Sequence, residues 1–292
     1  MKNTPRFGII GFGEVGQILA QDLVAAGCEL TGVFDLKFGD PASIPSQAAT
    51  SPYRPGQSHK DAVKGAQLVI SAVTAEQGLQ AAQAVAAGIE PGAFYVDVNS
   101  VSPGIKRASA EAIDAAGGRY VEAAVMSPFP PKRLATAMLL GGPHAQEFLP
   151  LAASLGFAGA KVFSDKVGPA SATKMCRSVM IKGIEALLTE SMLTARHYGV
   201  EETVLASLSD LLPVGDWEKL ARYMISRSLE HGTRRAEEMR EVANTVREAG
   251  IAPLMSAAAA ERQYWAAAYK SALANDNLGA MLDAILHDRK RA

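Results

Sequence analysis

Short apolar runs alternate with segments of helical periodicity along the first part of the chain. A short apolar run bounded by turn residues is typical of a buried strand, whereas apolar side chains at every third or fourth position indicate a helix. Residues 37–60, rich in Pro, Ser and Gly, show no clear period and are expected to form no regular structure. Strands that alternate with helices are typical of a doubly wound parallel sheet. We predict strands at 7–10, 30–34, 68–73, 94–98, 120–125, 137–141 and 160–163, and helices around 15–24, 76–88 and 103–116.

The pattern changes after the Gly-Pro pair at 168–169. From residue 170 to residue 198 the apolar positions follow helical spacing, and few strand-like runs come after them. We therefore predict an α/β domain over residues 1–166 and an all-α domain over residues 167–292, joined by a long interdomain helix.

Composition narrows the class of partner. Of the 292 residues, 48% are hydrophobic and 20% are charged, and the formal net charge is -1. This is ordinary globular composition without the charge that attracts nucleic acid or anionic lipid, so we expect a small-molecule partner. No apolar run is long enough for a membrane helix. Two cysteines are too few for a disulfide framework and the five histidines have no metal-ligand spacing, so we expect a reducing, cytoplasmic location and no metal.

A glycine pattern follows the first predicted strand and opens the first predicted helix. Its residues are Gly11, Phe12, Gly13, Glu14, Val15 and Gly16. In the G-x-G-x-x-G fingerprint of Rossmann domains, the first glycine permits a tight turn and the second lets the backbone approach a pyrophosphate. The third allows close packing of helix on strand, and the helix N-terminus supplies N–H groups for the phosphates. An ordinary strand-helix turn without a ligand is the alternative interpretation.

An acidic residue supports the nucleotide interpretation. Asp35 ends the second predicted strand, near the offset of ~20 residues at which a carboxylate accepts from the ribose 2′-hydroxyl. That carboxylate would repel the 2′-phosphate of NADP, whereas Lys37 could partly offset its charge. We therefore expect NAD as the cofactor, with NADP as the alternative. Val73 and Thr74, after the third strand, are expected to complete the cofactor site.

Four segments in order resemble the β-hydroxyacid dehydrogenase superfamily, which includes 6-phosphogluconate and 3-hydroxyisobutyrate dehydrogenases. The first is the glycine motif with Asp35. Residues 97–103 (DVNSVSP) resemble the substrate loop of the family, and residues 121–125 (VEAAV) resemble the strand before a second substrate loop. Residues 168–174 (GPASATK) are similar to the segment that begins the interdomain helix. The resemblance implies that Lys174 is the catalytic residue and that a homodimer forms through the helical domain.

The chemistry of these positions fits the resemblance. Oxidation of an alcohol by hydride transfer requires removal of the hydroxyl proton, and a lysine screened from water can be a base near neutral pH. Lys174 lies on the first turns of a helix, whose N-terminal end disfavours a nearby ammonium charge. A surface lysine is the alternative interpretation. The resemblance further implies that Asn99 and Ser100 bind the substrate carboxylate.

The chain departs from the family pattern at three places. Ser178 replaces the usual Asn four residues after the lysine and stays a candidate substrate ligand with shorter reach. Ile181 stands where decarboxylating members carry a glutamate, so decarboxylation loses its expected acid, although Glu185 on the same face could reach the pocket. Residues 126–131 (MSPFPP) replace a glycine-rich loop with a stiff segment, which predicts a bulkier pocket wall.

A polar cluster marks the helical domain. His231, Arg234 and Arg235 form an H-x-x-R-R stretch similar to that of a poorly characterised subgroup of the superfamily. In the family the distal domain helps to bind the anionic end of the substrate, and an arginine fork suits a carboxylate or a phosphate. The alternative interpretation is a solvated helix start with Arg-Glu pairs at helical spacing.

Together these features predict an NAD-dependent dehydrogenase that acts on a 3-hydroxy acid, or on the corresponding semialdehyde or keto acid, with Lys174 as general acid/base. Two other functions stay open. A reductase of imines or semialdehydes would use the same scaffold with Lys174 as proton donor, and an NAD-binding protein could have kept the cofactor site without catalysis. In each case the expected partner is a small molecule, anionic for the dehydrogenase, and neither nucleic acid nor a membrane.

Overall fold

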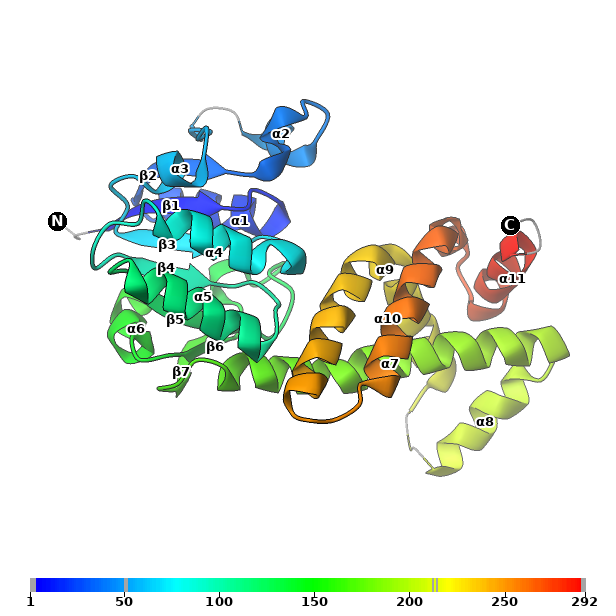
Figure 1. Ribbon diagram of the computed structural model, residues 1–292. Helices are drawn as coiled ribbons and strands as arrows, with labels where there is room; N and C mark the ends of the chain where they lie inside the picture. Colours follow the sequence, from blue (N-terminus) through cyan, green and yellow to red (C-terminus); the bar gives the residue numbers. More distant parts are fainter. Residues whose placement is uncertain (1–3, 50–51, 212, 214, 290–292) are drawn as a thin grey trace. The chain divides into compact units, whose positions relative to one another are not determined.

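The computed structural model describes residues 4–49, 52–211, 213 and 215–289. Two compact units make up the chain, Met1–Met175 and Cys176–Ala292. The first is a sheet covered by helices, and the second consists of helices (Figure 1). The predicted combination of an α/β region and an all-α region is confirmed.

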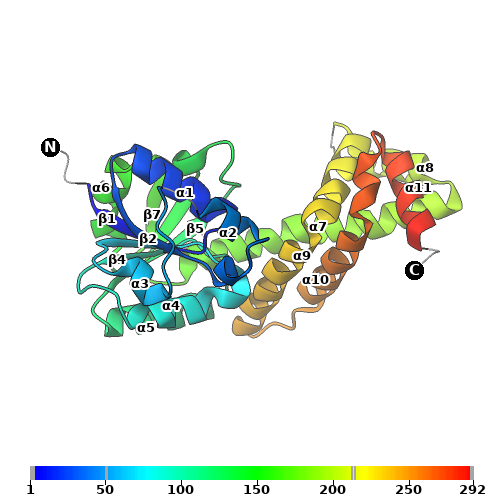
Figure 2. The same ribbon diagram turned by 90° about the horizontal axis from the view of Figure 1, so that it is seen from above.

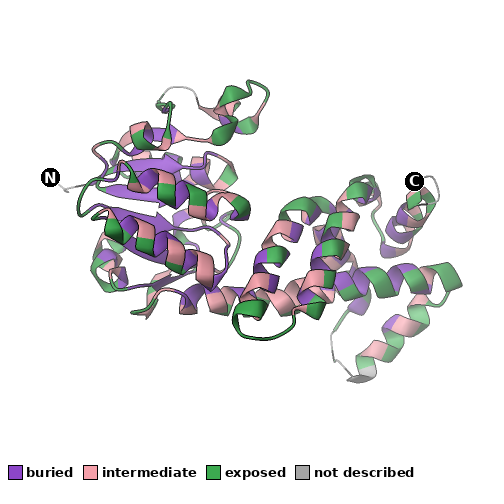
Figure 3. Cartoon of the chain, in the orientation of Figure 1, coloured by how far each residue is buried: buried purple, intermediate pink, exposed green. Residues whose placement is uncertain are grey.

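A seven-stranded sheet forms the centre of the first unit, in the order β2-β1-β3-β4-β5-β6-β7. Every predicted strand is present, and most of them are short apolar runs whose side chains are buried on both faces (Figure 3). The strands are β1 (Arg6–Ile10), β2 (Glu29–Phe34), β3 (Leu68–Ser71), β4 (Phe94–Asp97), β5 (Arg119–Val125), β6 (Met138–Gly141) and β7 (Ala160–Ser164).

One strand corrects the expectation of a wholly parallel sheet. β6 pairs antiparallel with β5, whereas all other neighbouring strands are parallel. A parallel neighbour requires a crossover, usually a helix. The segment between β5 and β6 contains only the short 3-10 helix η3 (Arg133–Ala135), so the chain turns back instead.

Helices cover both faces of this sheet (Figure 2). One face is covered by α1 (Glu14–Ala25) and α6 (Ala145–Ser154), whose apolar side chains pack with the strands in the larger core. The other face is covered by α3 (His59–Val63), α4 (Gly78–Ala86) and α5 (Pro103–Ala115). Helix α4 follows the 3-10 helix η2 (Ala75–Gln77).

The expectation of no regular structure over residues 37–60 is wrong. This segment contains the 3-10 helix η1 (Leu36–Gly39), α2 (Ile44–Ala48) and the start of α3. Serine side chains begin both short helices, because Ser43 accepts from the N–H of Ser46 and Ser58 accepts from the N–H of Asp61. Helices of five residues are too short to show a period in the sequence.

The second unit packs its helices around a core of its own, which includes Trp217, Tyr269 and Met281. Helices α9 and α10 approach closely at Gly232, where a Cβ would lie 2.3 Å from the carbonyl oxygen of Gln263. The helices are the rest of α7 (Pro169–Tyr198), α8 (Glu201–Leu211), α9 (Trp217–Glu248), α10 (Leu254–Ala266), the 3-10 helix η4 (Ala267–Ala274) and α11 (Leu278–Arg289).

The division between the units falls inside α7, later than the predicted boundary at residues 166–167. The reason lies at the start of this helix. The backbone N–H groups of Gly168 and Ser171 donate to the side chain of Glu122 on β5, so the first turns of α7 belong to the first unit. Lys174 therefore lies in the unit that carries the glycine motif.

The described residues form neither a membrane-spanning helix nor a cluster of metal ligands. No helix there combines the length and apolar character needed to cross a bilayer. No three His, Cys, Asp or Glu side chains of that part of the chain gather as metal ligands.

Candidate functional site

The glycine motif forms the turn between β1 and α1. Gly11 has a φ of +89°, and a Cβ there would lie 2.4 Å from the carbonyl oxygen of Ala72. A Cβ on Gly16 would lie 1.9 Å from the carbonyl oxygen of Gly11, so helix and strand pack too closely for a side chain. A Cβ on Gly13 would meet nothing within 4 Å. This glycine therefore faces open space at the N-terminus of α1, where a pyrophosphate can approach the backbone N–H groups.

Asp35 fastens the end of β2 to this turn. Its Oδ2 accepts from the N–H of Phe12 at 2.8 Å, and its Oδ1 accepts from the N–H of Lys37 at 2.9 Å. Each carboxylate oxygen keeps a further lone pair for a ribose hydroxyl. The ring of Phe12 is fully buried and packs edge-on against Tyr53, with centroids 5.1 Å apart.

The rest of the motif lies at the start of α1, and the loop after β3 lies next to the glycine turn. Glu14 is exposed in the first turn of α1, and Val15 is partly buried beside the core. Val73 follows β3, and its Cγ1 lies 2.9 Å from the place of a Cβ on Gly11. Thr74 comes next and begins η2. These residues fit NAD(P), which can exchange a hydride with a substrate when it is bound.

Asn99 joins the cofactor loop to the predicted substrate loop. Its Oδ1 accepts from the N–H of Val73 at 2.7 Å, and its Nδ2 donates to Oγ of Ser71 at 2.9 Å. The side chain is 4% exposed. Its amide is thus engaged in holding the two loops together, whereas sequence reasoning predicts a ligand of the substrate carboxylate. To bind the substrate carboxylate, the amide would have to give up its hydrogen bonds to Val73 and Ser71.

A buried polar network lies beneath the substrate loop. The carboxylate of Asp97 accepts from the N–H of Asn99 at 2.9 Å, pairs with Nζ of Lys106 at 2.9 Å and accepts from the hydroxyl of Tyr120 at 2.7 Å. The side chains of Lys106 and Asp97 are fully buried. Burial raises the pKa of Tyr120 well above its ordinary value, and the charge of Asp97 raises it further, so the phenol remains a donor. This network fixes the backbone that leads to Ser100.

Lys174 reaches the predicted substrate loop. Its Nζ donates to Oγ of Ser100 at 2.5 Å, and both side chains are partly buried. An amine and a hydroxyl in direct contact can bind a substrate oxygen and exchange a proton with it. The structure therefore brings together Ser100 and Lys174. Asn99, next to Ser100, is hydrogen-bonded to Val73 in the loop after β3.

Ser178 lies one helical turn after Lys174 and is partly buried. In the loop over residues 126–131, the ring of Phe129 is only 4% exposed and packs in the core of the first unit. The aromatic side chain therefore supports the fold, and the bulkier pocket wall stays a prediction.

The H-x-x-R-R residues lie on α9 in the second unit. Arg235 pairs with Glu185 of α7, whose side chain is 2% exposed and also accepts from Nε2 of Gln263 at 3.1 Å. Arg234 is 60% exposed and lies 3.7 Å from Glu238, one turn further along. His231 lies 3.2 Å from Glu230. The guanidinium of Arg235 and the carboxylate of Glu185 thus bind each other.

Sequence reasoning did not find Lys182. Its Nζ donates to Glu238 at 2.5 Å, which joins α7 to α9. Burial lowers the pKa of this lysine from its ordinary value, and the pairing with Glu238 offsets part of that effect. Its spacing from Lys174 and Ser178, four residues at each step along α7, is the signal that could have drawn attention to it.

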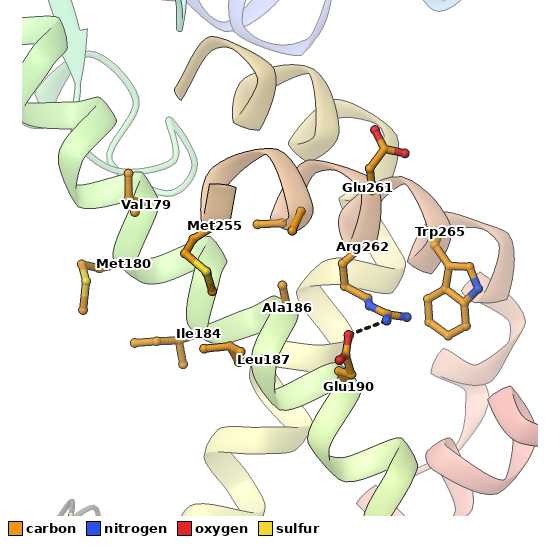
Figure 4. A pocket seen from close by; sticks show the side chains of 13 residues that line it. Val179, Met180, Ile184, Ala186, Leu187, Glu190, Met255, Glu261, Arg262 and Trp265 are labelled. Atoms are coloured by element: carbon orange, nitrogen blue, oxygen red, sulfur yellow. Dashed lines mark hydrogen bonds and ion pairs between the residues drawn. The ribbon is translucent and has the colours of Figure 1, made fainter. Parts of the chain in front are cut away.

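A groove of about 880 Å³ lies between α7 and α10 in the second unit (Figure 4). We refer to it as the α7/α10 groove. An ion pair between Glu190 and Arg262, 2.6 Å long, stands at its wall. Its lining is otherwise mostly apolar and includes Val179, Met180, Ile184, Leu187, Met255 and Trp265.

Known proteins match both parts of the chain. Residues 6–166 match the NAD binding domain of 6-phosphogluconate dehydrogenase, and residues 195–265 match a domain of unknown function, DUF1932. A conserved hypothetical protein from Sinorhizobium meliloti 1021 has a crystal structure with a TM-score of 0.74 and 33% sequence identity, over 97% of this chain and 96% of that one.

Two further relatives show how far the similarity extends. An uncharacterized 28.5 kDa protein of Methanothermus fervidus is 29% identical over 253 residues, which are 86% of this chain and 94% of that protein. The 3-hydroxyisobutyrate dehydrogenase of Mycobacterium tuberculosis shares the fold, with a TM-score of 0.70 at 18% identity, over 97% of this chain and 99% of that one. The predicted resemblance is confirmed, and the chain belongs to the family defined by the NAD binding domain of 6-phosphogluconate dehydrogenase.

Proposed function

We propose that the protein is a dehydrogenase that transfers a hydride between NAD and a 3-hydroxy acid, with Lys174 as general acid/base. The observation that carries the proposal is the contact between Nζ of Lys174 and Oγ of Ser100. It lies in the unit that contains the open glycine turn. A dinucleotide site and a proton acceptor are the two parts that alcohol oxidation requires.

In the oxidation direction, NAD held at the glycine turn would supply the hydride acceptor, and Nζ of Lys174 would take the proton of the substrate hydroxyl as the carbinol C–H and O–H bonds break. The carbon and oxygen are left as a carbonyl group. Ser100 would donate to the substrate carboxylate and so keep the substrate hydroxyl within reach of Lys174, which its own hydroxyl contacts. The lysine must enter this step unprotonated, so oxidation should slow as pH falls and the amine becomes protonated.

The substrate anion is assigned to groups that keep free donor capacity. Because the amide of Asn99 is engaged with Val73 and Ser71, we assign the near carboxylate to Ser100 and the backbone beside it. Within the second unit taken by itself, Arg234, with 60% of its side chain exposed, is the guanidinium of the H-x-x-R-R stretch best able to bind an anion. Arg235 is a weaker candidate, since Glu185 already neutralises its charge.

The proposal is tested by turnover with a panel of 3-hydroxy acids, followed by the absorbance of the reduced nicotinamide. The same enzyme is assayed in reverse with semialdehydes, keto acids and cyclic imines, with NAD(H) and NADP(H) compared throughout. Oxidation of at least one 3-hydroxy acid is expected. Turnover of imines without any turnover of hydroxy acids would instead identify an imine reductase. Tight NAD binding without any turnover would identify a binding protein.

A further inference from the structure

We propose that Glu122 positions Lys174 by fastening the first turn of α7 to the sheet. This inference rests on the proposed acid/base role of Lys174. Glu122 lies in the middle of β5, and its side chain is fully buried. A buried carboxylate requires hydrogen-bond partners, and the partners of this one are the backbone of the helix that carries the lysine.

The contacts replace those that a helix normally makes for itself. The first N–H groups of any helix have no partner within it, and a capping box satisfies two of them with side chains of the helix. Gly168, directly before α7, has no side chain, and its φ of +120° disfavours any other residue. Glu122 makes both bonds instead. Its Oε2 accepts from the N–H of Gly168 at 2.8 Å and its Oε1 from the N–H of Ser171 at 2.7 Å.

The neighbouring strand leaves room for this carboxylate. Gly141 on β6 is the register partner of Glu122, and a Cβ there would lie 2.5 Å from Oε2. Any side chain at residue 141 would displace the carboxylate from the helix. The absence of a side chain is therefore needed for the cap.

The strand on the other side carries a matching group. Asp97 on β4 is the register partner of Glu122 in the parallel pair, and it too is fully buried. Asp97 orders the loop that ends in Ser100, and Glu122 orders the helix turn that leads to Lys174. Two adjacent buried carboxylates thus set the two halves of the contact between Lys174 and Ser100.

The geometry explains why the cap would matter for chemistry. Lys174 follows Ser171 by three residues, about one helical turn, so the bonds of Glu122 set both the position and the rotation of the lysine. The contact of its Nζ with Ser100 is 2.5 Å long. A displacement of about 1 Å is enough to cost ~10²-fold in a reaction that depends on alignment.

The decisive variant is Glu122→Gln, which keeps the size of the side chain. One carboxylate oxygen becomes an amide NH₂, which cannot accept from the helix. In the full chain, we expect the acetylation rate of Lys174, measured by peptide mass spectrometry, to rise severalfold. Lys106, buried in the same unit, should stay protected from acetylation. The acetylation rate of exposed Lys64 serves as the reference for reagent activity. With a substrate in hand, kcat should fall about tenfold or more while NAD affinity is unchanged.

Further variants separate positioning from loss of stability. Gly141→Ala keeps Glu122 but displaces its carboxylate, so it should give the same change at Lys174. Glu122→Asp keeps the charge with a shorter reach and should give an intermediate rate. Val85→Ala, a fully buried position on α4, is the control that lowers stability and leaves the labelling of Lys174 as in the parent.

The labelling needs no substrate, so it is independent of the proposed function. Faster labelling of Lys174 in both Glu122→Gln and Gly141→Ala supports the positioning role, even if Lys174→Ala later proves active and removes the acid/base role. An unchanged rate in both variants overturns the proposal. An equal rise at Lys106 also overturns it, because the whole unit would then have loosened.

Discussion

The two units of this chain use buried charge differently. In the first, Asp97, Lys106 and Glu122 are all fully buried, and their hydrogen bonds end at the backbone beside Ser100 and Lys174. In the second, Glu185 is buried against Arg235, and this pair joins two helices. Buried charge in the first unit orders a site, whereas in the second it connects secondary structure.

The surfaces differ as well. Exposed large apolar side chains are concentrated in the helical unit, where Met180, Leu187, Leu254 and Met255 are each more than half exposed beside the α7/α10 groove. Large exposed apolar patches are typical of interaction sites. The comparison shows that the first unit buries most of its large apolar side chains. The second still has an apolar surface to bury.

The largest expected effect tests whether the chemistry belongs to the first unit. Lys174→Ala should leave the fold and NAD affinity nearly unchanged and reduce kcat ~10²- to 10⁴-fold, the usual range for loss of a general acid or base. Lys174→Arg should rescue little, because a guanidinium does not lose its proton near neutral pH. Steady-state rates with the substrate from the panel provide the measurement. Retention of more than about a tenth of parental kcat by the alanine variant would remove the lysine from the mechanism.

The next effect tests whether Arg235 is structural. Arg235→Met leaves the carboxylate of Glu185 buried without its partner, so the free energy of unfolding should fall by about 3–5 kcal/mol. Denaturant unfolding of the full chain measures this change.

The matched control is the double variant Glu185→Met/Arg235→Met, which removes both charges and should recover most of the lost stability. If the double variant folds well but its KM for the anionic substrate rises as much as in Arg235→Met, then Arg235 binds substrate and the structural interpretation is wrong.

The third effect concerns the apolar surface, which we propose is covered by a second copy of the chain. Met180, Ile184 and Leu187 recur at helical spacing on α7, and a Cβ on Gly183 would meet nothing within 4 Å. A symmetric pair could therefore bring the two α7 helices together, with the stripe of each copy filling the groove of the other. Met180 and Leu187 of this stripe are exposed, and Ile184 is partly buried.

Leu187→Glu would bury a charge in that interface without a partner, so it should shift a dimer toward monomer, as measured by light scattering across micromolar concentrations. Lys64→Glu, on the surface of the first unit, is the control for a change of charge. A parent chain that is monomeric throughout this range would contradict the proposed dimer.

The sequence predicted the features that depend on neighbours along the chain. Most strands contain a short run of consecutive buried residues, and the glycine motif works within six residues of one turn, so both can be recognised locally. The two short helices between residues 37 and 60 were missed because each has a single turn and depends on a serine cap. The direction of β6 was missed because it depends on the absence of a crossover helix between β5 and β6. The periodicity of apolar residues does not reveal that absence.

The residues of the candidate site could be named from the sequence, whereas their contacts with distant parts of the chain could not. Lys174 and Ser100 could be named because the resemblance covers both segments, and the structure places them in contact. The tie of Asn99 to Val73, the cap by Glu122 and the pairing of Arg235 each join residues at least 26 positions apart. A local sequence pattern does not contain such long-range contacts. From the sequence, a polar residue in a motif could therefore be interpreted only as a ligand of the substrate or cofactor.

The smallest effect concerns cofactor choice, for which we propose Asp35 as the selective group. Asp35→Asn keeps an acceptor for the N–H of Phe12 and removes the charge. The hydrogen bond to the ribose 2′-hydroxyl should weaken, and the repulsion of a 2′-phosphate should disappear. A change of about 1 kcal/mol in each direction, typical of one hydrogen bond, would raise the NAD dissociation constant roughly fivefold and lower that of NADP to a similar degree. Titration of both nucleotides against the intrinsic fluorescence of parent and variant measures the two constants. Because the comparison uses ratios, a general weakening of the turn would raise both constants together and can be told apart from a change in selectivity. Tighter binding of NADP than of NAD by the parent chain would show that Lys37, two residues further on, outweighs the carboxylate.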